Sequence, residues 1–270
     1  MGYIYFILII IALIALEAYF HSPAVKGRKG EQDIVFLLDI NSLSMRGSKT
    51  LTNVYLPKES GDTTEIDVLY ITRKGLFVIE SKNYAGYIFG NEANKNWTVT
   101  LYAGKSWSGG KKVEKHQFYN PIWQNRTHIK YLKSYLGSDW GSDIKTFSLV
   151  TFSDRGSLKN VSVNTDAKDV YVCNHADLRR ILRKISDENP DVLDDAQIEE
   201  IYNKLLPLTK VDKTAKKEHI EKINDRFGST DVCPVCGDKL VLRTAKKGPN
   251  AGNQFYGCSN YPKCKYTKKL

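Results

Sequence analysis

The sequence predicts an α/β (α+β) fold with an N-terminal transmembrane helix and a small C-terminal zinc ribbon. Three observations support this: β-rich runs alternate with amphipathic helical segments, the first residues are almost wholly apolar, and four of the five cysteines lie near the C-terminus. A chain of 270 residues has room for one sizeable core and a small appendage. We therefore expect an anchor at residues 1–21, a main domain at 26–207, a charged linker at 208–230 and the ribbon at 231–270.

The N-terminal apolar run indicates a membrane anchor. Gly2 to Leu16 carries no charge, and Ala18 to Phe20 extends the run past Glu17, close to the ~20 residues that span a hydrocarbon core. A cleaved signal peptide is the alternative, but no basic region precedes the run and no convincing small-x-small cleavage site follows it. The basic residues within Lys26 to Lys29 favour the cytoplasm for the downstream side. We expect a single-pass protein of the inner or plasma membrane with cytoplasmic soluble domains.

A helix is predicted next, from the spacing of apolar residues between Gly30 and Leu38. Glu31 stands near its start and has two interpretations. An acidic residue suits the first turn of a helix because of the helix dipole. Alternatively, Glu31 points at the polar face of the hairpin described below, as a further carboxylate.

A predicted β-hairpin contains the main candidate site. Ile66 to Thr72 and Leu76 to Lys82 are β-rich runs joined by a tight turn. Side chains alternate between the two faces of a strand, so Asp67, Glu80 and Lys82 share one face in either possible register. Burying two carboxylates and a lysine among Val, Ile and Leu is costly without a partner. A metal ion is the obvious partner. The opposite face takes Val68, Tyr70, Phe77 and Ile79.

Further strands and helices complete the predicted main domain. A strand at Thr50 to Leu56 precedes the hairpin, and a meander of edge strands is expected between Gly86 and Phe118, with Trp97 in the core. Four lysines in this meander could line a phosphate-binding rim or lie in a solvated loop. They are Lys105, Lys111, Lys112 and Lys115. Strands at 147–152 and 170–172 and helices at 178–185 and 196–206 follow, and Cys173 is expected to be a small buried hydrophobe.

A helix should begin at Asn120-Pro121, with Asn as the N-cap and Pro at the first helical position. Its apolar face contains Ile122, Ile129, Leu132 and Leu136. A polar stripe follows Gln124, His128 and Tyr131. We expect this stripe to be solvated or to form hydrogen bonds, and the alternative is a metal pair formed by Gln124 and His128.

The cysteine cluster near the C-terminus predicts a zinc site. Cys233 and Cys236 form a CxxC knuckle, and Cys258 and Cys264 supply a second pair about 20 residues later. Two disulfides are the alternative, but they conflict with a cytoplasmic location. A segment of ~40 residues with few aliphatic side chains needs the metal for most of its folding free energy, on the order of 10 kcal/mol.

The positive charge is concentrated in the same part of the chain. From Ile201 to Leu270 there are 15 Lys and Arg against 6 Asp and Glu, which accounts for +9 of the net charge of +10. Such an excess favours a polyanion, either nucleic acid or an anionic membrane surface. We assign Phe255 and Tyr256 to the core of the ribbon, and Tyr261 and Tyr266 to possible stacking on bases.

The hairpin and its surroundings resemble the nuclease-related domain (NERD) family, over roughly Gly30 to Phe152. The resemblance is carried by Gly30-Glu31, Thr64 to Asp67, Lys74 to Asn83, Gly86, Trp97, and Asn120-Pro121 with Gln124. That family is similar to the restriction-endonuclease-like superfamily, whose signature is an acidic residue, a spacer and (Asp/Glu)-x-Lys. Here the signature becomes Asp67 with Glu80-Ser81-Lys82. The resemblance implies a mixed sheet flanked by helices.

The resemblance also implies a mechanism. Asp67 and Glu80 would hold Mg²⁺ or Mn²⁺, Lys82 would orient the nucleophile, and Glu31 and Gln124 would be auxiliary site residues. The C-terminal segment looks like the zinc finger of type IA topoisomerase tails, on Cys233-Pro-Val-Cys236 and Phe255 to Cys264. No small-molecule cofactor is expected.

Three functions are compatible with the sequence. The first is a membrane-anchored, metal-dependent nuclease whose zinc ribbon holds nucleic acid, DNA in preference to RNA. The second is a non-catalytic module of the same fold that tethers nucleic acid to the membrane, since a fold hosts several functions. In the third, the basic tail lies on anionic lipid and the ribbon binds a protein. The complete set of Asp67, Glu80 and Lys82 favours the enzyme.

Overall fold

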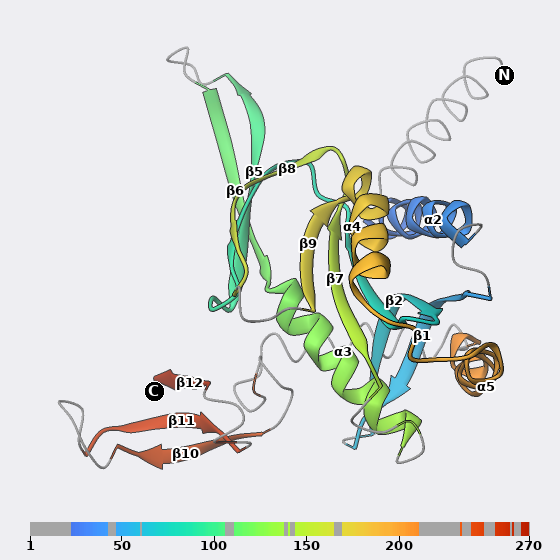
Figure 1. Cartoon of the computed structure of the whole chain (residues 1–270). Coiled ribbons are helices and arrows are strands. Elements are labelled where there is room, and N and C mark those ends of the chain that lie inside the picture. Colours follow the sequence, from blue (N-terminus) through green and yellow to red (C-terminus); the bar gives the residue numbers. More distant parts are fainter. Residues whose placement is uncertain are drawn as a thin grey trace, which may run out of the picture.

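A computed structural model describes most of the chain (Figure 1). The described residues are 23–42, 47–59, 61–105, 111–137, 140, 144–164, 169–210, 233, 239–245, 252–259, 261 and 266–269. The predicted anchor at 1–21 lies outside these residues, as does the linker from residue 211 onward. Among the helices that are described, none has the length and apolar character needed to cross a membrane.

The main sheet has five strands in the order β1-β2-β3-β7-β9. Its strands are β1 (Lys49–Pro57), β2 (Thr63–Thr72), β3 (Gly75–Lys82), β7 (Thr146–Phe152) and β9 (Val170–Asn174). β1, β2 and β3 are antiparallel, whereas β3, β7 and β9 run parallel. The sheet is therefore mixed, as the sequence predicts.

β2 and β3 form the predicted hairpin, in the register that turns at Arg73-Lys74. Tyr70 pairs with Phe77 and Thr72 pairs with Gly75, and one further step along this register places Asp67 opposite Glu80. Gly75 has a φ of +119°, and a Cβ there would meet the Lys145 carbonyl oxygen at 2.3 Å. Only glycine fits this end of the turn, because L side chains rarely adopt that conformation.

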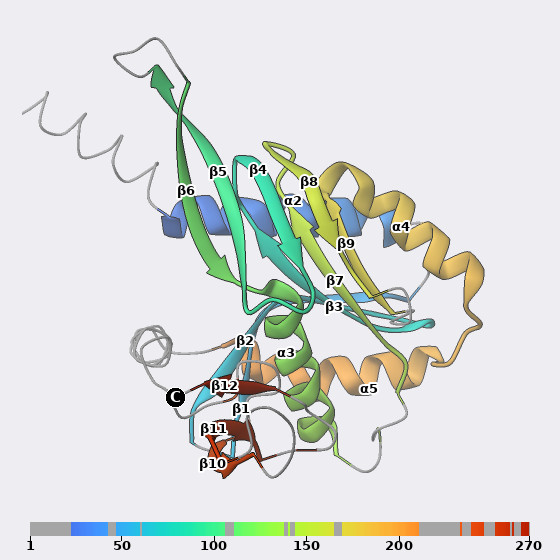
Figure 2. The same cartoon turned by 90° about the vertical axis from the view of Figure 1, so that its left-hand side faces the viewer.

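Two pairs of helices cover the two faces of the main sheet (Figures 1 and 2). α2 (Pro23–Ser42) and α4 (His175–Glu188) pack on the face that carries Val68, Tyr70, Phe77 and Ile79. α3 (Pro121–Leu136) and α5 (Asp195–Leu205) pack on the opposite face. Because Asp67, Glu80 and Lys82 alternate with the first set, they lie on the side of α3.

A second sheet has the strand order β6-β5-β4-β8. β4 (Gly86–Asn91), β5 (Asn96–Lys105) and β6 (Lys111–Tyr119) form the predicted meander, but in a sheet of their own rather than as edge strands of the main sheet. β8 (Gly156–Ser162) runs parallel to β4 and was not predicted, since its sequence has few β-formers. Trp97 is 1% exposed and stacks on Phe152, which confirms its core assignment.

Local capping sets the ends of two helices. The Asn120 side chain accepts hydrogen bonds from the backbone N–H groups of Ile122 and Trp123, so α3 begins where the sequence predicts. Asp194 forms a capping box with Gln197 at the start of α5. A short 3₁₀ turn, η1 (Leu206–Thr209), follows α5.

The C-terminal segment forms a three-stranded antiparallel sheet of β10 (Leu240–Thr244), β11 (Gln254–Cys258) and β12 (Thr267–Lys269). Tyr261 is 62% exposed, in accord with a stacking role, whereas Tyr266 is partly buried. Tyr266 packs against the buried cysteines, and its ring meets that of Trp123 edge-on at 6.0 Å. Sequence spacing does not reveal this contact because its two residues lie far apart in the chain.

Candidate active site

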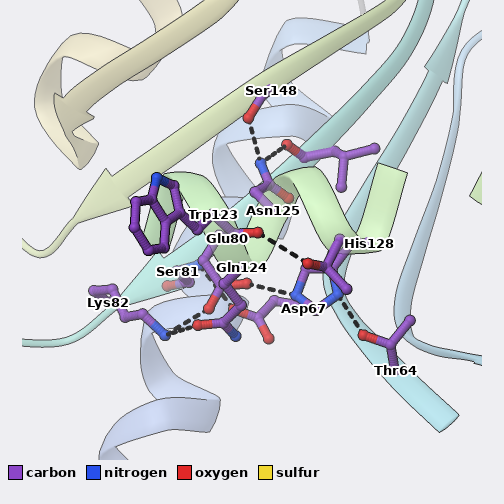
Figure 3. Close-up of polar contacts among 12 residues, drawn as sticks. Thr64, Asp67, Glu80, Ser81, Lys82, Trp123, Gln124, Asn125, His128 and Ser148 are labelled. Atoms are coloured by element: carbon purple, nitrogen blue, oxygen red, sulfur yellow. Dashed lines mark hydrogen bonds and ion pairs between the residues drawn. The ribbon is translucent and has the colours of Figure 1, made fainter. Parts of the chain in front are cut away.

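The polar face of the hairpin meets the first half of α3 (Figure 3). Lys82 donates hydrogen bonds to Glu80 Oε1 at 2.5 Å and to Gln124 Oε1 at 3.1 Å. Glu80 is 1% exposed and the Lys82 side chain 20% exposed. The structure therefore brings together three of the predicted site residues, and Asp67 stands opposite Glu80 on the neighbouring strand.

The second oxygen of Glu80 contacts His128. His128 Nε2 lies 3.1 Å from Glu80 Oε2, and His128 Nδ1 lies 2.7 Å from Thr64 Oγ1. The solvated alternative for the polar stripe is thus wrong at His128, which is 4% exposed, and the hydrogen-bonding alternative holds. Gln124 and His128 do not form a metal pair, because they contact different partners, Lys82 and Glu80. The spacing of four residues from Gln124 was the available signal for His128.

Asp67 is held differently from Glu80. Its Oδ2 accepts a hydrogen bond from the backbone N–H of Ser81 at 2.8 Å. Burial, and after it the negative charge of Glu80, raises the pKa of Asp67 well above its usual value. Lys82 and the Ser81 N–H oppose this shift only in part.

The other two charges of the cluster stabilise each other. Burial disfavours the ionised form of Glu80, but the Lys82 ammonium and the His128 hydrogen bond hold its pKa below the usual value. Burial likewise disfavours the charge of Lys82, yet Glu80 and Asp67 raise its pKa. Glu80 and Lys82 therefore form an ion pair, and Asp67 is a second carboxylate near the same ammonium.

Glu31 approaches the hairpin from α2. Its Oε2 accepts a hydrogen bond from Asn53 Nδ2 at 3.3 Å, and its charge contributes to the raised pKa of Asp67. The pairs on either side of Asn53 keep one register, which places Asn53 opposite Asp67, and its φ is +53°, a conformation that Asn tolerates better than most residues. The helix-dipole interpretation of Glu31 is wrong, because α2 begins at Pro23 and Glu31 lies well inside it.

Asn125 fixes α3 against the sheet and was missed in the sequence. Its Nδ2 donates to the carbonyl oxygen of Val78 at 2.8 Å and to Ser148 Oγ at 2.9 Å, so one amide bridges β3 and β7. Asn125 is fully buried next to Gln124. This bridge fixes the position of α3 along β3. It thereby aligns Gln124 and His128 with Lys82 and Glu80.

The donor set suits a hard divalent cation. Asp67 and Glu80 offer carboxylate oxygens, which Mg²⁺ and Mn²⁺ prefer, and Mg²⁺ commonly uses only one or two carboxylates together with water and substrate phosphate. Within the described ranges, no group of three or more His, Cys, Asp or Glu side chains is arranged as a metal cage. The raised pKa of the buried Asp67 carboxyl, beside an ammonium that pairs with Glu80, is the observation that fits a cation, because a bound cation would favour its ionised form.

Replacing Asp67 by Asn is expected to raise the melting temperature of the metal-free protein at neutral pH, by at least about 2 °C. Because the folded-state pKa of Asp67 exceeds the unfolded value, its contribution to stability is present at low pH and is lost as the pH rises through the folded-state pKa. Asparagine has no carboxyl group to ionise, so the Asp67→Asn variant does not lose stability in this way at neutral pH. Thermal unfolding in EDTA at neutral and acidic pH measures the difference, which should shrink on acidification. An equal gain from Asp187→Asn, at an exposed carboxylate on α4, would contradict this explanation.

Replacing His128 by Ala is expected to destabilise the protein, because Glu80 Oε2 and Thr64 Oγ1 both lose a buried partner. Each buried polar group left unsatisfied costs about 1–3 kcal/mol. Urea denaturation of the full chain checks this. His116→Ala, at a side chain that is 57% exposed, serves as the control and should change the stability by no more than about 0.5 kcal/mol. Equal effects of the two substitutions would mean that the His128 contacts contribute nothing.

Two of the four predicted zinc ligands belong to the described residues. Cys233 and Cys258 are each 1% exposed and share a small cluster with Leu240 and Tyr266. Neither thiol is part of a disulfide within the described ranges. Cys236 and Cys264 lie outside those ranges. Two buried thiols from separate segments suit one tetrahedral Zn²⁺ ion.

Comparison with known families finds two matches in the chain. Residues 26–153 match the model of the Nuclease-related domain, and residues 230–270 match that of the Topoisomerase DNA binding C4 zinc finger. The second match suggests Zn²⁺ binding and DNA binding by the C-terminal segment. Both assignments agree with the resemblances inferred from the sequence.

Individual relatives match either most of the chain or a short part of it. An uncharacterized protein of Bacillus anthracis is 30% identical over 226 residues, which cover 83% of this chain and 97% of the relative. DNA topoisomerase 1 of Methanocaldococcus jannaschii is 54% identical over 39 residues, 14% of this chain and 4% of that protein. DNA topoisomerase 1 of Mycoplasmoides gallisepticum is 62% identical over 68 residues, 25% of this chain and 8% of that protein. No solved structure matches the chain.

Proposed function

This chain belongs to the nuclease-related domain family, and we propose that it is a membrane-anchored, metal-dependent nuclease that hydrolyses phosphodiester bonds in DNA or RNA. One observation supports catalysis most directly. The ammonium of Lys82 contacts both Glu80 and Gln124, and the buried carboxylate of Asp67 stands opposite Glu80. A lysine held between a carboxylate and an amide, beside a second carboxylate, suits phosphoryl transfer better than a purely structural role.

Asp67 and Glu80 would hold Mg²⁺ or Mn²⁺ through their carboxylate oxygens. When bound, such an ion polarises the phosphoryl group and lowers the pKa of a bound water. Lys82 then orients the nucleophile and offsets the negative charge that develops on the phosphate. Gln124 keeps the Lys82 side chain in place, and His128 holds the second oxygen of Glu80 so that its first oxygen stays directed at the site.

The zinc ribbon would hold the nucleic acid near this site. Cys233, Cys236, Cys258 and Cys264 would bind Zn²⁺, and the basic residues around them would contact phosphates. The Arg243 guanidinium lies 5.9 Å from the ring centroid of Tyr261, which is exposed and able to stack on a base. The family of the ribbon favours DNA over RNA as the partner.

A cleavage assay tests the proposal. The fragment that begins near Lys26 is incubated with single- and double-stranded DNA and RNA in Mg²⁺, in Mn²⁺ and in EDTA. We expect cleavage in the presence of the metal and none in EDTA. Glu80→Ala should be inactive, whereas Asp187→Asn, an exposed carboxylate on α4, should retain activity. Absence of cleavage of every substrate, or equal cleavage by Glu80→Ala, would contradict the proposal.

The second candidate is a non-catalytic module that tethers nucleic acid to the membrane. It is favoured by the short contact between Lys82 and Glu80, since this ion pair satisfies an oxygen that a metal would otherwise use. Tight binding of nucleic acid without cleavage in either metal would support this candidate.

The membrane part of the proposal rests on the apolar run at residues 2–16. A protease-protection assay on inverted and right-side-out vesicles checks the topology. We expect the C-terminal domains to be digested only when the cytoplasmic face is accessible. Protection of the C-terminus inside an extracytoplasmic lumen would contradict the proposed orientation.

A further inference from the structure

The outer face of the second sheet carries a group of exposed apolar side chains. Tyr87 and Phe89 on β4 are 53% and 37% exposed, Tyr102 on β5 is 62% exposed, and Val113 on β6 is 51% exposed. The inward side chains of the same strands, such as Ile88 and Trp97, belong to a buried cluster. Strand alternation therefore directs the exposed group outward, where no described element covers it.

The strand register gathers these side chains on one surface. Tyr87 pairs with Thr100, and Thr100 pairs with Lys115 on the next strand. Tyr102 pairs with Val113. The Thr100 side chain is short and bends back to the Tyr87 carbonyl oxygen, so it does not cover the neighbouring rings. The result is an open surface of tyrosine and phenylalanine rings over adjacent strands.

The charge on this surface is positive. The Lys159 ammonium lies 5.0 Å from the ring centroid of Tyr87, and Lys115 is exposed on the same face. The four strands contain five lysines and one acidic residue, Glu114. Glu114 is adjacent in sequence to Lys115 and so points to the opposite side of β6, where it lies 3.8 Å from His116. Aromatic rings together with lysines, and without a carboxylate on the same face, complement a polyanion that carries flat rings.

The sheet that carries this surface packs next to the candidate active site. The chain leaves β3 at Lys82 and reaches Tyr87 after five residues, a span of at most about 18 Å. Ile88 and Trp97 of the second sheet share a buried cluster with Phe152 of β7 and with Ile122, two residues before Gln124 on α3. A strand of nucleic acid that reaches Lys82 would therefore pass next to this sheet.

We propose that the outer face of the second sheet, formed by Tyr87, Phe89, Tyr102, Lys115 and Lys159, is a stacking platform for single-stranded nucleic acid. The inference rests on the proposed function, because it names the substrate class of the same site. Single strands fit better than duplexes, since bases reach aromatic rings only when they leave the base stack. A duplex would present phosphates and leave the rings unused.

Equilibrium binding of the full-length chain to fluorescent oligo(dT), and to a duplex of equal length, tests the platform in EDTA, where no cleavage occurs. The double variant Tyr87→Thr/Tyr102→Thr keeps β-forming residues on exposed positions, so the strands should persist. We expect it to lose at least about tenfold in affinity for oligo(dT), because it removes two base–aromatic stacks, each worth roughly fivefold or more. Duplex affinity should be unchanged. The matched control Tyr87→Phe/Tyr102→Phe retains the rings and should bind as the parent chain does.

A second variant keeps the test independent of folding. Lys159→Gln should reduce the slope of log affinity against log salt for oligo(dT) by about 0.7, one phosphate contact on a single strand. Unchanged oligo(dT) affinity in the threonine variant, or an equal loss for oligo(dT) and duplex, would overturn the platform. Parallel sedimentation with phosphatidylserine vesicles gives another overturning result: loss of vesicle binding with unchanged oligo(dT) binding would identify a membrane-contacting face.

The platform and the proposed function can fail separately. If oligo(dT) binding depends on the two tyrosines but no metal supports cleavage, the platform stands and the nuclease proposal fails. If the threonine variant cleaves and binds like the parent chain, the nuclease proposal stands and the platform is overturned.

Discussion

Replacing Lys82 by methionine is expected to reduce phosphodiester cleavage by roughly two to three orders of magnitude, the usual cost of removing one preorganised group that stabilises transition-state charge. Methionine has nearly the length of lysine but lacks the ammonium that contacts Glu80 and Gln124. Steady-state cleavage in Mg²⁺ measures the loss. Binding of nucleic acid should change far less, because the ribbon supplies its own basic contacts.

The same substitution should destabilise the metal-free protein. Without Lys82, the buried carboxylates of Glu80 and Asp67 have no ammonium beside them, and breaking a buried ion pair costs about 3–5 kcal/mol. Mn²⁺ should restore part of that stability, so thermal unfolding with and without the metal separates a folding defect from a catalytic one.

Lys74→Met provides the matched control for Lys82→Met. Lys74 lies on the same hairpin with the same side-chain exposure of 20%, but it pairs with Asp191 at the far end of the sheet. The Lys74→Met variant should retain cleavage activity. An equal loss of activity in the two variants would show that hairpin stability, rather than the ammonium at Lys82, governs the rate.

Removal of zinc is expected to unfold the C-terminal segment while the main domain stays folded. The buried apolar cluster described in this segment consists of Cys233 and Cys258, with Leu240 and Tyr266 partly buried against them. Such a small core supplies little folding free energy, so the metal must supply on the order of 10 kcal/mol or more. Circular dichroism during chelation should show loss of β-structure. A fully structured segment after complete zinc removal would falsify the zinc assignment.

Tryptophan fluorescence separates the two domains in that experiment. All four tryptophans precede residue 141, so their emission reports the main domain. Only Trp123 should respond, through its edge contact with Tyr266. Cys236→Ser should abolish zinc binding. Cys173→Ser should not, because Cys173 is buried in β9 and burial raises the pKa of its thiol to about 12.

Most elements of the fold could be predicted from local signals. The hairpin, the strand β1, the cap of α3 and the zinc knuckle each depend on residues a few positions apart. β8 could not be predicted, since its pairing with β4 depends on a strand more than 60 residues earlier. The start of α2 was also missed, so the dipole interpretation of Glu31 was wrong.

The site residues on the β2–β3 hairpin were predicted from the sequence, whereas those on α3 were predicted only in part. Asp67, Glu80 and Lys82 share a face because alternation along a strand is a local property that survives a change of register. Gln124 was implied by the family resemblance. Asn125 fixes the position of α3 on the sheet through its hydrogen bond to the Val78 carbonyl oxygen. This role leaves no sign in the sequence, because a buried asparagine and a solvated one look alike in a helical pattern.

The sequence by itself determined that two carboxylates and a lysine occupy one face of a hairpin and that four cysteines are spaced for one metal ion. Only the tertiary structure decided which side chains meet them. His128 contacts Glu80 rather than solvent because α3 packs along that face, and Tyr87 and Tyr102 remain exposed because the second sheet presents its other face to the core. Alternation follows from bonds between neighbouring residues, whereas burial depends on which distant element covers a face.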